Sequence, residues 1–253
     1  MERLQAALID VPGVEVRIVE RCTSTNSVLL SSAEERTVLL AAEEQTAGRG
    51  QRGRRWQSAP GADLTFSVAR RIQRPVRELA ALSLVAGVAA ATALRALGVA
   101  AASLKWPNDL MVGDAKLGGI LVETRAGEHR AAHAVIGIGI NCVRDAQRER
   151  RLRRAVASIE EFVAVSRNRL ITCLARSLVA ALERFEADGF EAARAQWERM
   201  DVHAGKKLRV RLANGRSVSG IGSGLAADGS LRLLTRRGER RVHSGRIVSA
   251  RLA

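Results

Sequence analysis

The chain has 253 residues, of which 47% are apolar, and a formal net charge of +15. This length suits one large core, or one large and one small domain. Without a run of 18 apolar residues or a signal-peptide pattern at its start, the chain is not expected to span a membrane or to be secreted. The scattered cysteines Cys22, Cys142 and Cys173 favour reduced thiols in a cytoplasmic protein over disulfides or a zinc site.

The positive charge comes mainly from arginine. Such a chain can bind nucleic acid, acidic proteins or phosphorylated substrates, or it can reflect a compositional preference for arginine. No recognition helix or aromatic stacking pattern accompanies the charge, so we do not expect sequence-specific nucleic-acid binding. The densest basic run, residues 144–154, also contains acids and indicates a solvated or mobile segment. His129 and His133 have helical spacing in a strand-like context, so no metal site is expected there.

Hydrophobic periodicity predicts a mixed α/β unit over the first 200 residues. In chain order we expect a strand at 14–20, a short helix at 27–34 after N-cap residues at 24–26, and strands at 38–42 and 64–70. A long apolar helix at 76–97 follows, and then strands at 104–106, 117–123 and 134–140. Helices at 170–185 and, after Gly189, up to Met200 complete this unit.

The pattern changes after Gly205. Short alternating runs at 208–212, 217–221, 231–234 and 240–243 are separated by Asn-Gly, Asp-Gly and Arg-Gly dipeptides. Turn dipeptides at this spacing are typical of a small β-barrel or sandwich. We therefore predict a large domain at 1–200 and a small β domain at 201–253.

Residues 48–56 read Gly-Arg-Gly-Gln-Arg-Gly-Arg-Arg-Trp. Glycine lets a ligand approach the backbone N–H groups closely, and arginine pairs with carboxylate or phosphate. The spacing matches neither the P-loop nor the dinucleotide-binding fingerprint. We interpret this segment as a loop that closes over a small anion carrying a flat group.

Three further segments place polar residues or glycines at predicted strand ends. Residues 105–110 read Lys-Trp-Pro-Asn-Asp-Leu, which predicts a tight turn after Lys105. Residues 116–123 contain a glycine pair, and residues 137–141 contain two more glycines and an asparagine. Paired glycines in a strand indicate either a bulge or close approach by a ligand or another backbone. Each segment is weak evidence alone, but all four in order indicate one ligand site.

With these segments the chain resembles the biotin–protein ligases, which attach biotin to a lysine of a carrier domain. The resemblance rests on Ser24-Thr25-Asn26, Gln45 and residues 48–56, 105–110, 116–123 and 137–141, and it covers essentially the whole chain. It implies an α+β fold: a mixed, mostly antiparallel sheet packed with helices, as in class II synthetases, plus a small C-terminal SH3-like β-barrel. Too few residues precede Ser24 for the N-terminal DNA-binding domain of some relatives, so specific operator binding is not expected.

The resemblance implies a two-step reaction. ATP activates the carboxylate of biotin as biotinyl-5'-AMP, releasing pyrophosphate, and a carrier lysine then attacks the mixed anhydride. Because the first step brings anions together, fixed cations must stabilise its transition state. Lys105 and Arg49 are the catalytic candidates: Lys105 would bridge the biotin carboxyl and the α-phosphate, and Arg49 would clamp both groups.

The other site residues follow from the same resemblance. Ser24, Thr25 and Gln45 would hydrogen-bond the biotin head, since a neutral ureido ring needs donors and acceptors rather than charges. The full biotin set is Ser24, Thr25, Asn26, Gln45, Arg49, Gly50, Gln51, Lys105, Gly118 and Gly119. The ATP or adenylate set is Arg49, Arg52, Arg54, Trp56, Asn108 and Asn141, with Trp56 as a flat wall near the adenine and Asn141 beside it. Mg²⁺ would accompany ATP, with Asp109 as a helper and no dedicated metal site. Trp106 is expected in the core.

Two positions depart from the family pattern. Gln51 stands where the family commonly has an arginine that helps the loop to retain the adenylate. A charge-assisted hydrogen bond contributes roughly 1.5–3 kcal/mol, against about 1 kcal/mol for a neutral one. We therefore expect the adenylate to escape more readily, unless Arg52 or Arg54 compensates. Arg246 stands where an acid is common, which weakens the case for an ATP contact from the C-terminal unit.

The implied partner is a biotin carboxyl carrier protein, by default an acetyl-CoA carboxylase subunit. No membrane partner is expected, and both a homodimer and a monomer agree with the resemblance. A lipoate–protein ligase is the alternative enzyme, which the polar set at Ser24, Thr25 and Gln45 disfavours. A basic nucleic-acid-binding protein is the non-enzyme alternative, and the chain, with no Tyr and four Phe, lacks the aromatics of a stacking platform.

Overall fold

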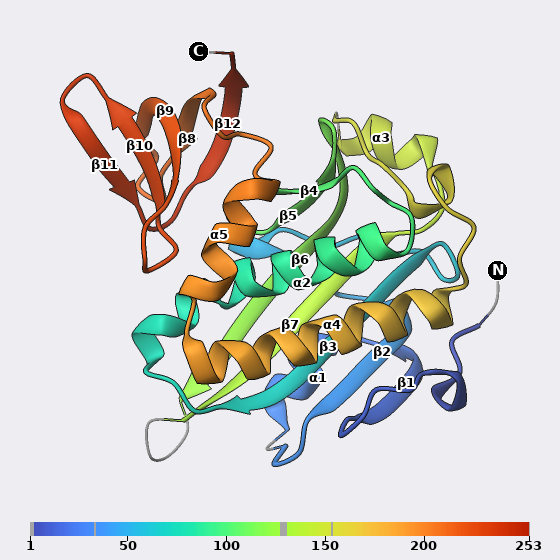
Figure 1. Cartoon of the computed structure of the whole chain (residues 1–253). Helices are drawn as coiled ribbons and strands as arrows, with labels where there is room; N and C mark the ends of the chain where they lie inside the picture. Colours follow the sequence, from blue (N-terminus) through green and yellow to red (C-terminus); the bar gives the residue numbers. More distant parts are fainter. Residues whose placement is uncertain (1–2, 33, 127–130, 153, 253) are drawn as a thin grey trace.

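A computed structural model describes residues 3–32, 34–126, 131–152 and 154–252 (Figure 1). Their strands form a seven-stranded sheet, in the order β1-β2-β3-β7-β6-β5-β4, and a five-stranded sheet, in the order β11-β10-β9-β8-β12. Strand β1 pairs with β2 in parallel, and the other pairs of described strands are antiparallel. The predicted mixed, mostly antiparallel sheet and the C-terminal β unit are confirmed.

The larger unit intersperses strands with helices. Its strands are β1 (Glu15–Cys22), β2 (Val38–Gln45), β3 (Asp63–Ile72), β4 (Ala102–Lys105), β5 (Asp109–Val112), β6 (Ala115–Ala126) and β7 (Ala132–Asn141). Its helices are η1 (Ala6–Leu8), α1 (Thr25–Ser31), η2 (Gln51–Gly53), η3 (Val76–Ala81), α2 (Leu82–Ala96), α3 (Ala146–Leu152), η4 (Ile159–Glu161), α4 (Arg167–Asp188) and α5 (Glu191–Met200). The C-terminal unit comprises β8 (Lys207–Arg211), β9 (Ser217–Leu225), β10 (Leu231–Thr235), β11 (Gly238–Val242) and β12 (Arg246–Arg251).

The two faces of the larger sheet are covered differently. Alternate residues of a strand point to opposite faces. In β3, Phe66 joins the main core, whereas Thr65 and Ser67 point to the other face. Helices α2 and α4 cover the core face, and α1 covers part of the opposite face (Figure 1). The rest of that opposite face carries the cavity described below.

The long apolar segment is a core helix. Residues Val76–Ala96 are long and apolar enough to cross a membrane by length and composition. In the structure, α2 packs against α4, α5 and strands β4, β5 and β6, and most of its side chains are buried. A helix that is apolar on all sides and covered in this way belongs to the interior of the protein.

Most predicted elements are confirmed with shifted ends, and some details are wrong. The helix predicted at 76–97 begins as the separate 3-10 helix η3, and strands β5 and β12 were not predicted. Asp109, expected in a turn, begins β5 because it pairs across the turn with Lys105. The segment 144–154, expected to be solvated or mobile, contains α3, and most of its described side chains are exposed, in agreement with a solvated segment; residue 153 lies outside the described residues.

The C-terminal unit is attached beside the turn between β4 and β5. Trp106 in that turn is 3% exposed, and its Nε1 donates to the carbonyl of Gly229 at 3.2 Å. The N–H of Val202 donates to the carbonyl of Leu104 at 3.0 Å. The expected burial of Trp106 is confirmed, and its indole links the two units.

Two ionisable residues are buried at this junction. Asp201 accepts a hydrogen bond from the backbone N–H of His203 at 2.9 Å. Burial raises the pKa of Asp201 from 3.8 to about 6 and lowers the pKa of His203 from 6.5 to about 4. The raised acid pKa makes stability fall as the pH rises through 4 to 6, whereas the lowered histidine pKa makes stability fall as the pH drops from 6.5 to 4.

We predict that Asp201→Asn raises the free energy of unfolding by about 1–3 kcal/mol above pH 7 and leaves it unchanged near pH 4. Asparagine keeps an acceptor for His203 and carries no buried charge. Urea unfolding of both proteins at the two pH values measures the difference. A gain of equal size at both pH values would contradict the explanation by buried charge.

Candidate active site

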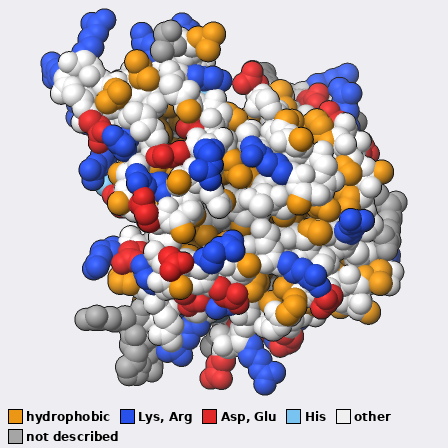
Figure 2. Space-filling model, viewed as in Figure 1, with side chains coloured by type: hydrophobic (Ala, Val, Ile, Leu, Met, Phe, Trp, Pro, Cys, Tyr) orange, Lys and Arg blue, Asp and Glu red, His pale blue; other side chains and the backbone are white. Residues whose placement is uncertain are grey.

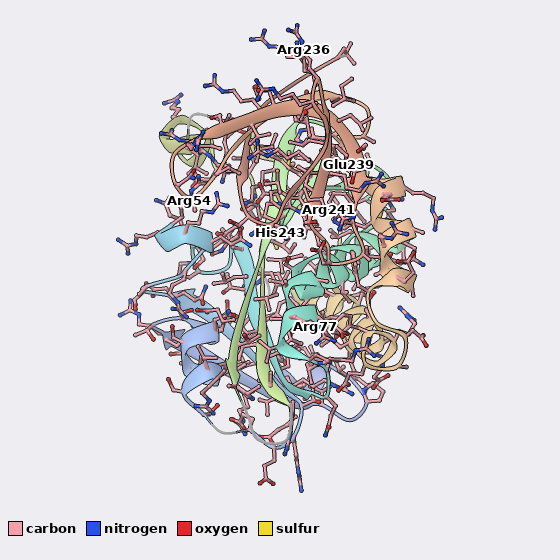
Figure 3. All side chains as sticks on the ribbon, turned by 90° about the vertical axis from the view of Figure 1, so that its left-hand side faces the viewer. Arg54, Arg77, Arg236, Glu239, Arg241 and His243 are labelled. Atoms are coloured by element: carbon pink, nitrogen blue, oxygen red, sulfur yellow. The ribbon has the colours of Figure 1, made fainter. Side chains whose placement is uncertain are left out.

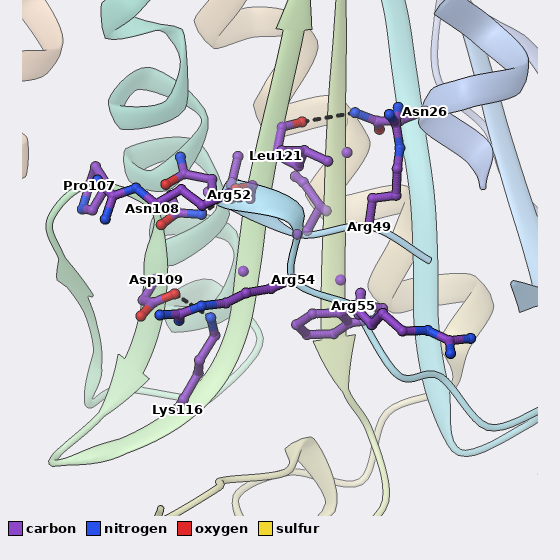
Figure 4. A pocket seen from close by; sticks show the side chains of 18 of the residues that line it. Asn26, Arg49, Arg52, Arg54, Arg55, Pro107, Asn108, Asp109, Lys116 and Leu121 are labelled. Carbon is purple, nitrogen blue, oxygen red and sulfur yellow. Dashed lines mark hydrogen bonds and ion pairs between the residues drawn. The ribbon is translucent and has the colours of Figure 1, made fainter. Parts of the chain in front are cut away.

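A cavity of about 320 Å³ lies on the face of the larger sheet opposite α2 (Figure 4). It is lined from α1, the 48–56 loop, β3, the β4–β5 turn, β6, β7 and the start of β12. Of the predicted site residues, the cavity brings together Ser24, Thr25, Asn26, Gln45, Arg49, Gly50, Gln51, Arg52, Arg54, Trp56, Lys105, Asn108 and Gly119. The predicted residues Gly118 and Asn141 do not line it.

A network of polar side chains occupies the end of the cavity next to α1. Gln45 Oε1 accepts hydrogen bonds from Thr25 N at 2.8 Å and Thr25 Oγ1 at 3.2 Å. Ser67 Oγ lies 2.6 Å from Thr25 Oγ1 and donates to Asn26 Oδ1 at 2.6 Å. Because Thr25 uses the oxygen of Gln45, the NH₂ group of Gln45 is the part that can donate to a ligand.

The side chain of Ser24 does not cap the helix that follows it. It occupies the N-cap position of α1, as predicted, and is 2% exposed. Its hydroxyl makes no capping hydrogen bond, although capping is the usual function of serine at this position. Ser24 lines the cavity, so its hydroxyl can bond a neutral polar group there.

The floor of the cavity is made by glycines of β6 and β7. A Cβ added to Gly139 would collide with the indole of Trp56, and a Cβ added to Gly119 would lie 3.5 Å from it. Trp56 therefore lies directly on the two strands because they carry no side chains there. The indole forms a flat wall, and its Nε1 is buried without a hydrogen-bond partner among the described residues.

Gly118 serves the packing of the sheet. A Cβ at Gly118 would lie 2.6 Å from the carbonyl oxygen of Gly139 and 2.8 Å from Cδ1 of Ile140. The position therefore needs glycine to let β6 lie against β7. The expected contact between Gly118 and biotin receives no support from this geometry.

The two predicted asparagines hold backbone segments. Asn108 Nδ2 donates to the carbonyl of Ile120 at 2.6 Å and fastens the β4–β5 turn to β6. Asn141 Nδ2 donates to the carbonyl of Lys116 at 3.1 Å. Asn141 lines a smaller adjoining hollow, which shares Trp56 and Lys116 with the cavity.

The 48–56 loop folds into a short hairpin over the cavity. Trp56 N donates to the carbonyl of Gly48 at 2.9 Å. At the tip, Arg52 and Gly53 both have left-handed backbone angles, with φ of 60° and 70°. Such a conformation costs a non-glycine residue energy, so the rest of the hairpin must impose it on Arg52.

Arg49 forms an ion pair with a carboxylate of the protein itself. Its guanidinium pairs with Glu123 Oε2 at 2.6 Å. Asn26 Nδ2 donates to the same oxygen at 3.0 Å, so Glu123 ties the loop to α1. Arg49 pairs with Glu123 through one terminal nitrogen, so a ligand anion can either meet its other N–H donors or replace Glu123.

The lining of the cavity concentrates positive charge. Its cationic lining residues are Arg49, Arg52, Arg54, Arg55, Lys105, Lys116, Arg154 and Arg246, and Asp109 is the single carboxylate among the described lining residues. Burial lowers the pKa of Lys105; Asp109 opposes this shift, and the nearby arginines add to it. A site of this kind favours ligands that bring negative charge.

Asp109 lies between two lysines. It is the cross-strand partner of Lys105, and its Oδ1 pairs with Nζ of Lys116 on β6 (Figure 4). Burial lowers the pKa of Lys116. An anion that enters here meets two partly buried lysines, of which Lys116 is paired with Asp109.

Sequence reasoning gave no ligand role to four residues that the structure places at the site: Ser67, Lys116, Arg154 and Arg246. Lys116 precedes the glycine pair by two residues, and this position is the one sequence feature that could have indicated its place at the site. Arg154 and Arg246 reach the cavity from the segment after α3 and from the C-terminal unit. No spacing rule links such distant elements. Arg246 lines the cavity. From the sequence an ATP contact there had less support, because the family commonly has an acid at this position.

Metal-binding geometry is absent from the described part of the chain: no three His, Cys, Asp or Glu residues are placed to hold an ion. His133 contacts the carbonyl of Leu29 through Nε2 at 3.0 Å, and His129 lies outside the described residues. The three cysteines are free thiols.

Solved structures share this fold. It is similar to the biotin protein ligase of Aquifex aeolicus solved with biotin and ATP, with a TM-score of 0.78, 23% identity, and coverage of 94% of this chain and 99% of that chain. It is also similar to the Helicobacter pylori biotin acetyl coenzyme A carboxylase synthetase, with a TM-score of 0.62, 24% identity, and coverage of 90% and 100%.

Sequence comparison gives the family. Residues 18–141 match the biotin/lipoate A/B protein ligase family. The chain is 36% identical to the bifunctional ligase/repressor BirA of Escherichia coli over 224 residues, which is 87% of this chain and 70% of that protein. It is 33% identical to the biotin–[acetyl-CoA-carboxylase] ligase of Mycobacterium tuberculosis over 86% of this chain and 82% of that protein. The chain therefore belongs to the biotin protein ligases of this family.

We predict that Ser24→Ala changes the free energy of unfolding by less than about 0.5 kcal/mol, because its hydroxyl caps nothing. Ser166 is the matched control, since it caps α4 by accepting from Arg169 N at 3.2 Å. Ser166→Ala should cost about 1 kcal/mol. Urea unfolding compares the two variants, and an equal loss in both would show that Ser24 stabilises α1.

Proposed function

We propose that this one cavity performs both steps of biotin attachment: ATP activates biotin as biotinyl-5'-AMP, and a carrier lysine then takes the biotinyl group. The supporting observation is that a neutral polar end and a strongly cationic end meet over a glycine floor. This arrangement matches a molecule with a neutral ureido head and an acyl-phosphate at its other end.

The biotin head binds at the α1 end. Ser24, Thr25 and the NH₂ group of Gln45 supply donors and acceptors for the ureido ring. Asn26 positions this set through Ser67 and Glu123 and has its own amide fully bonded. The valeryl chain then runs over Gly119 toward the lysines.

Activation takes place beside Asp109. Attack of the biotin carboxylate on the α-phosphate joins two anions, and positioned cations lower the barrier for such a step. Lys105 was the candidate for this function from sequence. Lys116 fits it at least as well, because its Nζ lies by Gly119 on the cavity floor and is held by Asp109. Arg49 leaves Glu123 to clamp the new phosphate ester.

The nucleotide lies at the cationic end. Arg52, Arg54, Arg154 and Arg246 surround the phosphates, and the adenine stacks on Trp56 near the hollow that Asn141 lines. Mg²⁺ prefers several oxygen ligands, and Asp109, tied to Lys116, is the single carboxylate among the described lining residues. Asp109 would hold the ion together with the phosphates, and the ion would neutralise part of their charge.

In the second step the carrier lysine attacks the acyl carbon, and AMP leaves. The cations that line the cavity disfavour the ammonium form of an incoming lysine. The amine therefore arrives more readily in its neutral, nucleophilic form, and its proton is lost to solvent or to the departing phosphate.

The acceptor is a biotin carboxyl carrier protein, and we place the reaction in the cytoplasm. We assign residues 1–200 to the catalytic domain and 201–253 to the C-terminal domain. We keep a homodimer as a proposal. Pairing of two sheets at the edge strand β1 is disfavoured, because β1 carries charged side chains such as Arg17 and Arg21.

The direct test combines the protein with ATP, Mg²⁺, biotin and a biotin carboxyl carrier domain, followed by a streptavidin blot. Biotin on the carrier lysine is the expected result. A parallel reaction with lipoate serves as control, and transfer of lipoate without biotin would refute the proposal.

We predict that Lys116→Ala and Lys105→Ala each lower biotin-dependent exchange of labelled pyrophosphate into ATP by about 10²–10³-fold, because one such electrostatic contact contributes about this much. Circular dichroism checks that both variants fold. If only Lys116→Ala is impaired, Lys116 is the bridging lysine. Exchange at the wild-type rate in both variants would contradict the assignment of either lysine.

We predict that Gln51→Arg slows the escape of biotinyl-adenylate by about tenfold, as a neutral hydrogen bond becomes a charge-assisted one. The dissociation rate of preformed labelled adenylate measures this. Equal rates in wild type and variant would show that Arg52 or Arg54 already compensates.

A further inference from the structure

Positive charge is concentrated in the C-terminal unit. Residues 201–253 contain twelve Lys and Arg against three acids, whereas the first 200 residues contain 29 against 23. Figure 2 shows basic side chains projecting from the C-terminal unit. A general preference of the chain for arginine would spread the excess over both units, so the excess in the small unit needs a separate explanation.

Much of this excess lies on one face of the five-stranded sheet. Leu208 and Val210 of β8 point into the core, and alternate residues of a strand point to opposite faces, so the cations between them point outward. Directly paired residues of neighbouring strands share a face, and two cations of β12 are paired with cations of β8. We call these five exposed residues the cationic face: Lys207, Arg209, Arg211, Arg246 and Arg251.

Like charges meet directly across this face. Arg211 is the cross-strand partner of Arg246, and Lys207 is the cross-strand partner of Arg251. Like charges in directly opposed positions of a sheet repel each other and destabilise the pairing. The pairing of β8 with β12 therefore carries an electrostatic cost that a bound anion would relieve.

The C-terminal sheet offers these cations no acid. Glu239 on β11 is the single acid in its strands. It binds Arg232 on β10 at 2.7 Å and lies 3.8 Å from Arg241 (Figure 3). None of the ion pairs in the described part of the chain includes a member of the cationic face. The negative charge that relieves the repulsion has to come from a partner.

The side chains of the face match a phosphodiester backbone. The three cations of β8 form a row about 13 Å long, since a strand rises about 3.3 Å per residue, and such a row suits a partner with regularly spaced anions. Ser217 and Ser219 of β9 are paired with Arg211 and Arg209, and Ser249 of β12 is paired with Arg209. Lys, Arg and Ser are among the side chains that contact DNA phosphates.

Other anionic partners fit less well. Protein interfaces have an apolar centre, and binding to a membrane surface gains strength from buried apolar area. The exposed apolar residues Ile221 and Leu234 lie to one side, on β9 and β10, and Val248 borders the main cavity. Residues 201–253 contain no Phe, Trp or Tyr, so the face lacks the stacking contacts that proteins use for single strands.

We propose that the cationic face binds the phosphate backbone of duplex nucleic acid without regard to base sequence. Such binding does not depend on biotin attachment, because four of the five residues lie outside the main cavity. Arg246 lines that cavity and is left unchanged in the variants below. Binding of this kind releases counterions from the duplex, so the affinity falls steeply as the salt concentration rises.

The test follows the fluorescence anisotropy of a labelled duplex of about 20 base pairs with the full-length protein, between about 50 and 200 mM salt. Four phosphate contacts predict a slope of about −3.5 for log K against log salt. Arg209→Gln/Arg211→Gln should make the slope shallower by about 2 and weaken binding about tenfold or more at low salt. Arg3→Gln/Arg21→Gln, which removes the same charge at the β1 edge of the larger sheet, should keep the wild-type slope.

Two measurements show whether Arg209→Gln/Arg211→Gln acts on the face alone. Pyrophosphate exchange should stay at the wild-type level, because neither residue lines the main cavity. The midpoint of thermal unfolding should stay the same or rise, because glutamine at position 211 removes the repulsion with Arg246. A lower midpoint would contradict the explanation by like-charge repulsion.

Four results would overturn the proposal. The first is that wild-type protein does not bind the duplex at about 50 mM salt. The second is an equal loss of binding in the two double variants. The third is a marked preference for one of two duplexes of unrelated sequence. The fourth is unchanged duplex binding in Arg209→Gln/Arg211→Gln together with weaker binding of anionic lipid vesicles or a higher KM for the carrier, which would make the face a lipid or protein site.

Discussion

The constraint on which the site depends is the excess of positive over negative charge among the described residues that line it. Eight lysines and arginines line one cavity with Asp109, and burial lowers the pKa values of Lys105 and Lys116. The charges are relieved locally by exchangeable partners: Asp109 holds Lys116, and Glu123 holds Arg49. In the proposed reaction, a ligand that carries phosphate and carboxylate would supply negative charge to these lysines and arginines, so the same electrostatic attraction would serve binding and catalysis.

The larger sheet makes this site possible because its two faces carry different side chains. Residues such as Phe66 and Ile138 point to the core under α2, and their neighbours in sequence, Thr65 and Gly139, point to the cavity. Period-two alternation therefore lets one strand build the core and the site together. The absence of side chains on Gly139 brings Trp56 onto the sheet, and the β4–β5 turn presents Lys105 on one side and anchors the C-terminal unit through Trp106 on the other.

How far the sequence predicted this molecule depends on whether the relevant interactions are local. Strand and helix patterns, the 48–56 loop, the turn after Lys105 and the polar set around Thr25 depend on neighbouring residues and were predicted. Lys116, Arg154 and Arg246 belong to one site only because β6, the segment after α3 and β12 converge in space, and no local pattern encodes that. Gly118 and Gly119 read alike in sequence, yet strand alternation sends one toward Ile140 and the other into the cavity.

The most direct measurement of the central claim is a crystal structure of the protein with biotinyl-5'-AMP. The account predicts that the ureido ring contacts Ser24, Thr25 and Gln45, that the phosphate lies within hydrogen-bond distance of Lys116 or Lys105, and that Arg49 has left Glu123 for the ligand. A phosphate bound away from both lysines, with the pair between Arg49 and Glu123 intact, would contradict the account.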